Sequence, residues 1–242
     1  MVLEKQAQIY KADQRGCSES EIFRRLCTFN FDDYRAISRH PFGALLALND
    51  ETLAAGNKIV RHVEENFDII LLPLVGGIVY KDSLGNQDII GTEQIRIFSA
   101  HKGMSYEITN PYEADLVNYI QVWLRPDKPF FASQSSQQDF NLSERNILIR
   151  LFEGNISDSP VLKTNTTADG FIGIFDGRKE GKYKLKNPDN GLFAFVINGA
   201  FEFENRLIES RDALSISGIY EAEFEALSEN AILLILEIPL KR

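Results

Sequence analysis

Hydrophobic residues along this chain fall into short runs that are either continuously apolar or alternate with polar residues. Residues 68–90, "DIILLPLVGGIVYKDSLGNQDII", hold two such runs separated by Gly76-Gly77, and Gly85-Asn86 follows the second run. Short runs bounded by glycine and asparagine are typical of β-strands joined by corners and tight turns. We therefore predict a strand, a glycine corner, a second strand and a turn within this segment.

The same pattern continues to the end of the chain. Residues 219–226, "IYEAEFEA", alternate so that an apolar set faces one way and three glutamates face the other. The apolar set is Tyr220, Ala222, Phe224 and Ala226, and the glutamates are Glu221, Glu223 and Glu225. Further strands are expected over residues 93–100, 118–126 and 231–240. The Asn198-Gly199 pair within "VINGAFEFEN" predicts a hairpin turn.

The order of these elements indicates two similar domains. Residues 127–141 are polar, rich in serine and glutamine and without period, so we expect a linker there. The glycine-corner pattern occurs once on each side of it, and helix signal is nearly confined to "SESEIFRRL" at residues 18–26. Many short strands with glycine corners are typical of jelly-roll barrels. The sequence therefore predicts an all-β chain with one barrel over residues 1–130 and another over residues 131–242.

Composition restricts the class of protein. The 242 residues, 44% of them hydrophobic, are enough to bury a sizeable core, and the formal net charge is −9. Nucleic acids and anionic membranes are bound by basic surfaces, so neither is an expected partner. No apolar run is long enough to span a bilayer, and the first ten residues hold no secretory signal. Cys17 and Cys27 fit ordinary thiols in a reducing cytoplasm, where we expect the protein to reside.

The chain has three histidines, and none follows His101. Any histidine-based chemistry therefore belongs to the first half, and the C-terminal barrel is predicted to have no metal site. In "RHVEENFD", residues 61–68, His62 and Glu64 stand two positions apart, which places both on one face of a strand. Asp68 follows four positions later. His62, Glu64 and Asp68 are thus the candidate metal ligands if a metal is bound.

Several segments in a fixed order resemble the pirins, a family of two-barrel cupins. "TFNFDDYRA" at residues 28–36 is similar to an aromatic segment of that family, and "IQVWL" at residues 120–124 is similar to its Q-x-W strand. The resemblance also covers residues 9–16, 42–56, 68–86 and 96–111, and more faintly residues 196–217. It implies two cupin barrels, a double-stranded β-helix in each half, and a metal bound in the N-terminal one.

The resemblance also implies a metal pattern, H-x-H followed by H-x-E. In this chain those four positions fall on His62, Glu64, Tyr106 and Ile108, so only His62 keeps the ligand type. We expect these four residues to converge in a pocket of the N-terminal barrel that is a degenerate metal site. No cofactor is favoured, with iron, nickel, copper or zinc as the alternatives.

Two functions follow from this pattern. The favoured one is a pirin-like bicupin of uncertain activity that binds a small molecule or a protein partner in or near the N-terminal barrel. The alternative is a metal-dependent dioxygenase similar to quercetin 2,3-dioxygenase, with an altered ligand set. Without a metal, His62 would be a hydrogen-bonded histidine of the pocket, Glu64 a carboxylate at its rim and Asp68 a solvated residue. Phe31 and Trp123 are expected to pack in the core.

Overall fold

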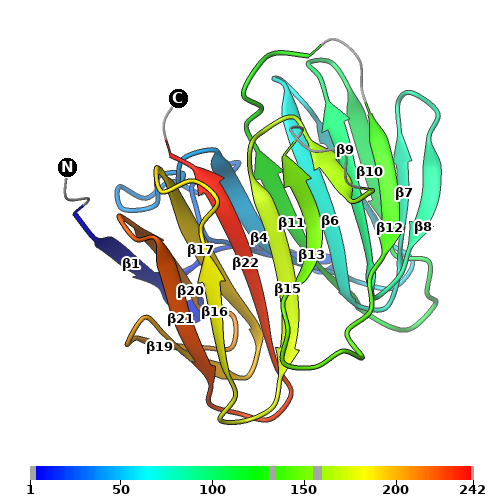
Figure 1. Ribbon diagram of the computed structural model, residues 1–242. Coiled ribbons are helices and arrows are strands. Elements are labelled where there is room, and N and C mark those ends of the chain that lie inside the picture. Colours follow the sequence, from blue (N-terminus) through cyan, green and yellow to red (C-terminus); the bar gives the residue numbers. More distant parts are fainter. Residues whose placement is uncertain (1–3, 131–133, 155–159, 241–242) are drawn as a thin grey trace.

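The computed structural model describes residues 4–130, 134–154 and 160–240, which form two β-barrels side by side (Figure 1). Each barrel is built from one seven-stranded and one four-stranded sheet. The only helical element among the described residues is the 3-10 turn η1 (Ala12–Gln14). In that part of the chain, no helix is long and apolar enough to cross a membrane. The predicted all-β fold with two barrels is therefore confirmed.

The N-terminal barrel contains most strands of the first half. Its larger sheet comprises, in spatial order, β12 (Ser135–Asp139), β9 (Gln94–Ala100), β6 (Phe67–Val75), β11 (Val117–Leu124), β4 (Leu45–Leu53), β3 (Phe23–Cys27) and β2 (Gly16–Glu19). Its smaller sheet comprises β5 (Lys58–His62), β10 (Ser105–Thr109), β7 (Ile78–Asp82) and β8 (Gln87–Ile90).

The C-terminal barrel has the same plan. Its larger sheet comprises β1 (Gln6–Tyr10), β20 (Ala213–Ser217), β17 (Asn190–Asn198), β22 (Ala231–Pro239), β15 (Asp169–Phe175), β13 (Ile149–Gly154) and β14 (Leu162–Thr164). Its smaller sheet comprises β16 (Glu180–Lys184), β21 (Glu221–Ala226), β18 (Ala200–Phe203) and β19 (Leu207–Glu209).

Each barrel has its own core, and a third core lies between the two larger sheets. In β11, Tyr119 and Trp123 belong to the core of the N-terminal barrel, whereas Ile120 and Val122 belong to the core shared with the C-terminal barrel. Successive residues of a strand point to opposite faces, so a strand buried on both faces supplies two cores. The shared core also contains Phe193 and Leu236 from the C-terminal barrel. The larger sheets therefore form the centre of the molecule.

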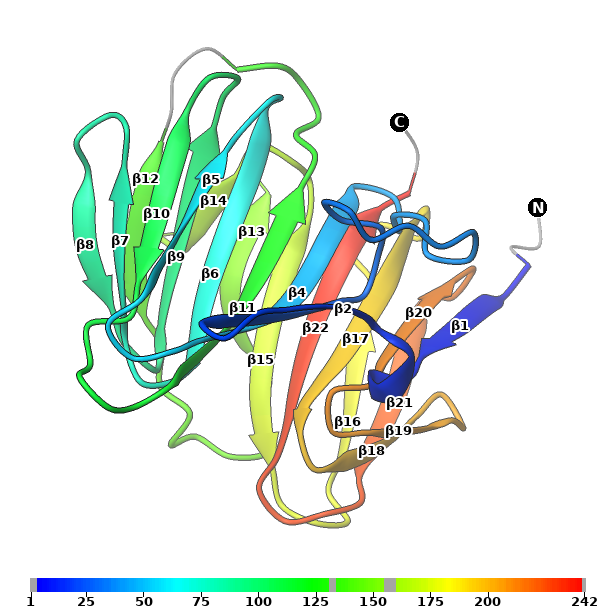
Figure 2. The ribbon, with the colours of Figure 1, turned by 180° about the vertical axis from the view of Figure 1, so that it is seen from behind.

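The two barrels exchange edge strands, as Figure 2 shows. The first strand, β1, pairs with β20 of the C-terminal barrel, and β12 pairs with β9 of the N-terminal barrel. Residues 135–139 are thus a strand where a linker was predicted, because an edge strand can pair through its backbone without apolar side chains. The predicted domain boundary at residues 130 and 131 adjoins residues 131–133, which lie outside the described residues.

Both predicted glycine corners carry the chain from the larger to the smaller sheet. Gly76 follows β6 with a φ of 70°, and Gly199 follows β17 with a φ of 80°, values that favour glycine. The hairpin predicted at Asn198-Gly199 is wrong, because β17 pairs with β20 and β22 whereas β18 pairs with β19 and β21. The turn at Gly199 is a jelly-roll corner between sheets.

The helix expected over residues 18–26 is also wrong. That segment forms the end of β2 and most of β3, which pair with each other, and β3 also pairs with β4. Tertiary pairing has overridden the helix propensity of its glutamate, leucine and arginine residues. The alternation predicted for β21 is confirmed, since Ala222, Phe224 and Ala226 are buried, but Tyr220 precedes the strand and is exposed.

Candidate functional site: the polar interior of the N-terminal barrel

The structure does not bring His62, Glu64, Tyr106 and Ile108 together. Tyr106 and Ile108 lie in the core of the N-terminal barrel, whereas His62 and Glu64 are exposed. In the pairing of β10 with β5, Tyr106 stands opposite Arg61, and Ile108 stands opposite Ile59. Residues opposite each other in an antiparallel pair share a face, so Arg61 lies on the inner face and His62 on the outer face. The expected convergence of the four residues is wrong by a shift of one residue.

Asp68, the remaining candidate ligand, is buried at the junction of the two barrels. Its carboxylate accepts hydrogen bonds from the Ser99 hydroxyl at 2.7 Å and from the Asn165 side-chain amide at 2.8 Å. The backbone N–H of Asn165 donates a third bond at 2.5 Å. Asp68 is therefore neither solvated, as one alternative expected, nor free to bind a metal.

The metal that the pirin resemblance implies does not fit the residues present. Ile108 has no donor atom, and His62 and Glu64 point away from Tyr106. Burial raises the pKa of Tyr106 well above its usual range, which keeps the phenol protonated and a poor ligand. Among the described residues, no three histidine, cysteine or acidic side chains form a group that could hold a metal ion.

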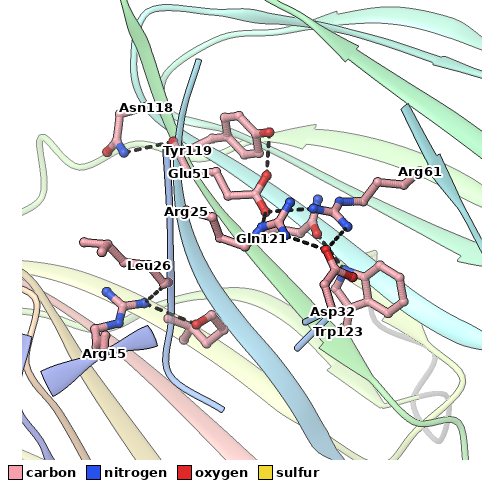
Figure 3. Close-up of polar contacts among 11 residues, drawn as sticks. Arg15, Arg25, Leu26, Asp32, Glu51, Arg61, Asn118, Tyr119, Gln121 and Trp123 are labelled. Atoms are coloured by element: carbon pink, nitrogen blue, oxygen red, sulfur yellow. Dashed lines mark hydrogen bonds and ion pairs between the residues drawn. The ribbon is translucent and has the colours of Figure 1, made fainter. Parts of the chain in front are cut away.

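A buried ion-pair network occupies the barrel interior instead (Figure 3). Its centre is Glu51 on β4, which is completely buried. The Arg25 Nε atom on β3 donates to Glu51 at 2.6 Å, and the Tyr119 hydroxyl on β11 donates to its other oxygen at 2.6 Å. Charge-assisted hydrogen bonds of this kind compensate a carboxylate for its lost hydration.

Arg61 on β5 joins the same network from the opposite sheet. Its guanidinium lies 3.6 Å from Glu51 and 2.9 Å from the carboxylate of Asp32, and its side chain is 10% exposed. Arg25 donates to the same Asp32 oxygen at 2.5 Å. Asp32 comes from the loop between β3 and β4, and its side chain is 47% exposed. One solvent-facing carboxylate thus bridges two buried guanidinium groups.

Aromatic rings surround this ion pair. The guanidinium carbons of Arg25 and Arg61 lie 5.2 Å and 5.1 Å from the centroid of the Phe31 ring, a cation–π arrangement. Phe31 meets Trp123 edge-on at 5.2 Å, and Phe67 lies 4.9 Å from Trp123. Trp123 is buried in the core, as expected, whereas Phe31 is only partly buried, and the two rings form one wall of the polar network.

Deeper in the barrel, several polar groups are buried without a well-formed hydrogen bond to the described residues. They are both amide atoms of Asn49, the amide nitrogen of Gln121 and the hydroxyl of Tyr106. Asn49 and Gln121 face each other across β4 and β11. The Gln121 oxygen accepts a bond from the Trp123 indole at 2.7 Å, and the Gln121 side chain also hydrogen-bonds the Tyr106 hydroxyl, so among the described residues the Asn49 amide is the group left without a partner. Buried polar groups normally have partners, so a further polar molecule is expected beside the Asn49 amide.

The protonation states suit binding better than proton transfer. Burial and the nearby charge of Glu51 raise the pKa of Tyr119 well above its usual range, so the phenol remains a donor. Burial raises the pKa of the Cys27 thiol to about 11, so it is not a nucleophile near neutral pH. Burial also raises the pKa of Glu51, against the opposing effects of Arg25 and Tyr119. The interior offers fixed positive charge and hydrogen-bond donors.

The prediction from sequence missed Arg25, Arg61, Glu51 and Asp32. A signal for them was present in β4, "LLALNDETL", where Asn49 and Glu51 share one face with the apolar residues Ala47 and Leu53. Polar residues on the inner face of a barrel strand require partners inside the barrel. In such a strand they indicate an internal polar site.

Comparisons with known proteins cover both barrels. The family model described as Pirin matches residues 10–124, and the model described as quercetinase C-terminal cupin domain matches residues 134–238. The putative quercetin 2,3-dioxygenase PA1210 of Pseudomonas aeruginosa is 27% identical over 210 residues, which are 86% of this chain and 89% of that protein. The quercetin 2,3-dioxygenase of Escherichia coli K12 is 25% identical over 139 residues, 57% of this chain and 60% of that protein.

Solved structures with the same architecture include YhhW from Escherichia coli. It matches with a TM-score of 0.88 at 18% identity, over 98% of this chain and 99% of that chain. The bacterial pirin YhhW in complex with nickel(II) matches with a TM-score of 0.87 at 18% identity, over 98% of this chain and 100% of that chain. At this identity the likeness shows the shared fold.

Proposed function

The chain belongs to the pirin family of bicupins, and we propose that its N-terminal barrel binds a small organic carboxylate between Arg25 and Arg61, without the family's metal centre. The observation that carries the proposal is the carboxylate already held there. Asp32, from a loop, is bound by both guanidinium groups at 2.5 Å and 2.9 Å. Paired arginines with such geometry recognise carboxylates through directed, charge-assisted hydrogen bonds.

The charge balance of the site favours an anion. Arg25 and Arg61 carry two positive charges, and buried Glu51 neutralises one of them. Asp32 neutralises the other, but it is half-exposed and belongs to a loop. If Asp32 moves away, one net positive charge is left in a largely buried site, where electrostatic attraction is stronger than in water. An external carboxylate of suitable shape would restore neutrality.

The inner end of the site supports a ligand with further polar atoms. The unpaired amide of Asn49 would be satisfied by water or by hydroxyl and carbonyl groups of a ligand. The dioxygenase alternative rests on the names of relatives, and this chain lacks the donor set for a redox metal at the aligned positions. We therefore place the binding function ahead of it.

Isothermal titration calorimetry with acetate and benzoate, at constant ionic strength against chloride, tests the proposal. Arg61→Gln should weaken carboxylate binding about tenfold to a hundredfold, because a hydrogen bond to a charged group contributes about 1.5–3 kcal/mol. The matched control is Arg24→Gln, since Arg24 is the exposed neighbour of Arg25 on the same strand and should bind like the parent.

Two results would overturn the proposal. The first is equal carboxylate affinity in the parent and in Arg61→Gln. The second is that no carboxylate binds either to the parent or to a variant in which Asp32 has been removed.

A further inference from the structure

We infer that Phe31 and Asp32 together are an internal ligand of the arginine pair, and that the external ligand they exclude is an aromatic carboxylate. The inference rests on the proposed function and adds the class of ligand and the group that blocks it. Asp32 supplies a carboxylate to both guanidinium groups, and the Phe31 ring lies next to both of them and to Trp123. The adjacent ring and carboxylate present the two features of an aromatic acid.

The backbone around these two residues forms a short, closed turn. The backbone N–H of Phe31 donates to the Tyr34 carbonyl at 3.2 Å, and the N–H of Tyr34 donates back to the Phe31 carbonyl at 3.0 Å. Asp32 has a φ of 46°, in the left-handed region, which is costly for residues other than glycine and less so for aspartate and asparagine. Such a conformation persists where surrounding contacts hold it, and here those contacts are the two arginines.

Both sides of the turn are anchored, so its tip can move without unfolding the barrel. Phe29 is completely buried in the core between the barrels. On the other side, the Tyr34 ring packs directly on Gly16, where a Cβ atom would lie 2.4 Å from the ring. Between these anchors, Phe31 is only half-buried and Asp32 is exposed. Displacement of the tip therefore breaks the contacts of two side chains.

The surfaces beneath the tip suit an aromatic ring. Trp123 is 8% exposed and lies under Phe31, with Phe67 beside it. The Arg25 guanidinium also lies 4.8 Å from the ring of Phe23. A ligand ring in the place of Phe31 would keep both the edge-to-face contact with Trp123 and the cation–π contacts with the arginines. An aliphatic acid would fill the carboxylate position and lose these contacts.

The test compares Asp32→Ala with Asp33→Ala. Asp33 is the exposed neighbour of Asp32, so its removal changes the same net charge without vacating the arginines. Asp32→Ala should bind benzoate at least tenfold more tightly than the parent, because it removes a tethered competitor. Asp33→Ala should bind it like the parent. In Asp32→Ala, benzoate should bind at least tenfold more tightly than acetate.

The single tryptophan provides a second signal. When benzoate displaces Phe31 from Trp123, the tryptophan emission of the parent should change with the same saturation curve as the calorimetric heat. The Arg61→Gln variant should need about tenfold to a hundredfold more benzoate to reach the same heat and the same change in emission. Far-UV circular dichroism of each variant verifies that the barrel is retained.

The outcomes separate the two proposals. If Asp32→Ala and the parent bind benzoate equally, and Arg61→Gln binds it at least about tenfold more weakly, the arginine site stands and the internal-ligand inference fails. If benzoate and acetate bind Asp32→Ala equally, the aromatic class is wrong. If Asp32→Ala binds no carboxylate, the proposed function fails as well.

Discussion

Asp68 joins the two barrels through a buried carboxylate, and replacing it with asparagine should destabilise the whole chain. One of its oxygens accepts bonds from Ser99 and from the Asn165 side chain, and the other accepts the Asn165 backbone N–H. An amide in its place presents an NH2 group to at least one of these donors, whichever way it is turned. A hydrogen bond to a charged group contributes about 1.5–3 kcal/mol. Removing the charge returns part of its desolvation cost, so we expect a net loss of about 2 kcal/mol at pH 7.

Urea unfolding, followed by tryptophan emission and far-UV circular dichroism, measures this loss. Asn165→Ala and the double variant complete a mutant cycle, in which Asp68 and Asn165 should couple by about 1–2 kcal/mol because they are in direct contact. The control is Asp33→Asn, an exposed aspartate whose replacement should change the free energy of unfolding by less than about 0.5 kcal/mol.

The pH dependence gives a sharper test of the same contact. Burial raises the pKa of Asp68 above its ordinary value of 3.8, against the opposing hydrogen bonds of Asn165 and Ser99. The folded chain therefore binds this proton more tightly than the unfolded chain does, and this contribution to stability falls as pH rises from about 4 towards the raised pKa. Asparagine at position 68 does not titrate, so the free energy of unfolding of Asp68→Asn lacks this dependence on pH. The difference in the free energy of unfolding between the parent and Asp68→Asn should therefore become smaller from pH 4 to pH 7. A gap that widens, or a loss below about 0.5 kcal/mol throughout, would refute the inter-barrel role.

Two further predictions concern the thiols and the aligned metal positions. Cys17 is exposed and Cys27 is buried with a pKa of about 11, so iodoacetamide at pH 8 should label one thiol in the native chain and two in urea. Rapid labelling of both native thiols would contradict the burial of Cys27. The triple variant Glu64→His, Tyr106→His and Ile108→Glu should gain no more thermal stability from nickel(II) than the parent, because position 64 is on the outer face. A gain approaching about 2.7 kcal/mol at a hundredfold excess over the dissociation constant would show that the positions converge after all.

The strands could be predicted because most of them bury side chains in a regular alternation. In β21 and β22 the alternating or continuous apolar pattern corresponds to the observed burial. The exchange of the edge strands β1 and β12 between the barrels could not be predicted, because no comparable pattern in the sequence indicates it. The "SSQQD" sequence of β12 is wholly polar, and its pairing with β9 depends on backbone groups that every residue possesses. The partner of such an edge strand is decided by the tertiary fold.

The register of β5 shows why the site itself was mispredicted. Residues 59, 61 and 63 are Ile, Arg and Val, and residues 60, 62 and 64 are Val, His and Glu. Alternation alone favours the first set as the inner face, since it contains two apolar residues, and the structure agrees. The pirin resemblance favoured the second set because it aligned His62 with a ligand. A single residue of slip in a strand exchanges the two faces, so burial pattern is the better guide to register than the identity of one residue.

The electrostatics of the observed inner face select against the metal that the family pattern implies. A divalent cation about 5 Å from a guanidinium group is repelled by about 6–7 kcal/mol at an effective dielectric constant of about 20. Arg25 and Arg61 both impose this repulsion, and the buried carboxylate of Glu51 offsets one of them, whereas the loop residue Asp32 offsets the other only while it occupies the site. A monovalent anion in the same place is attracted by each arginine with about half that energy. Arg61, which occupies the inward position next to His62, therefore supports the proposal that the barrel interior binds an organic anion in place of a metal cation.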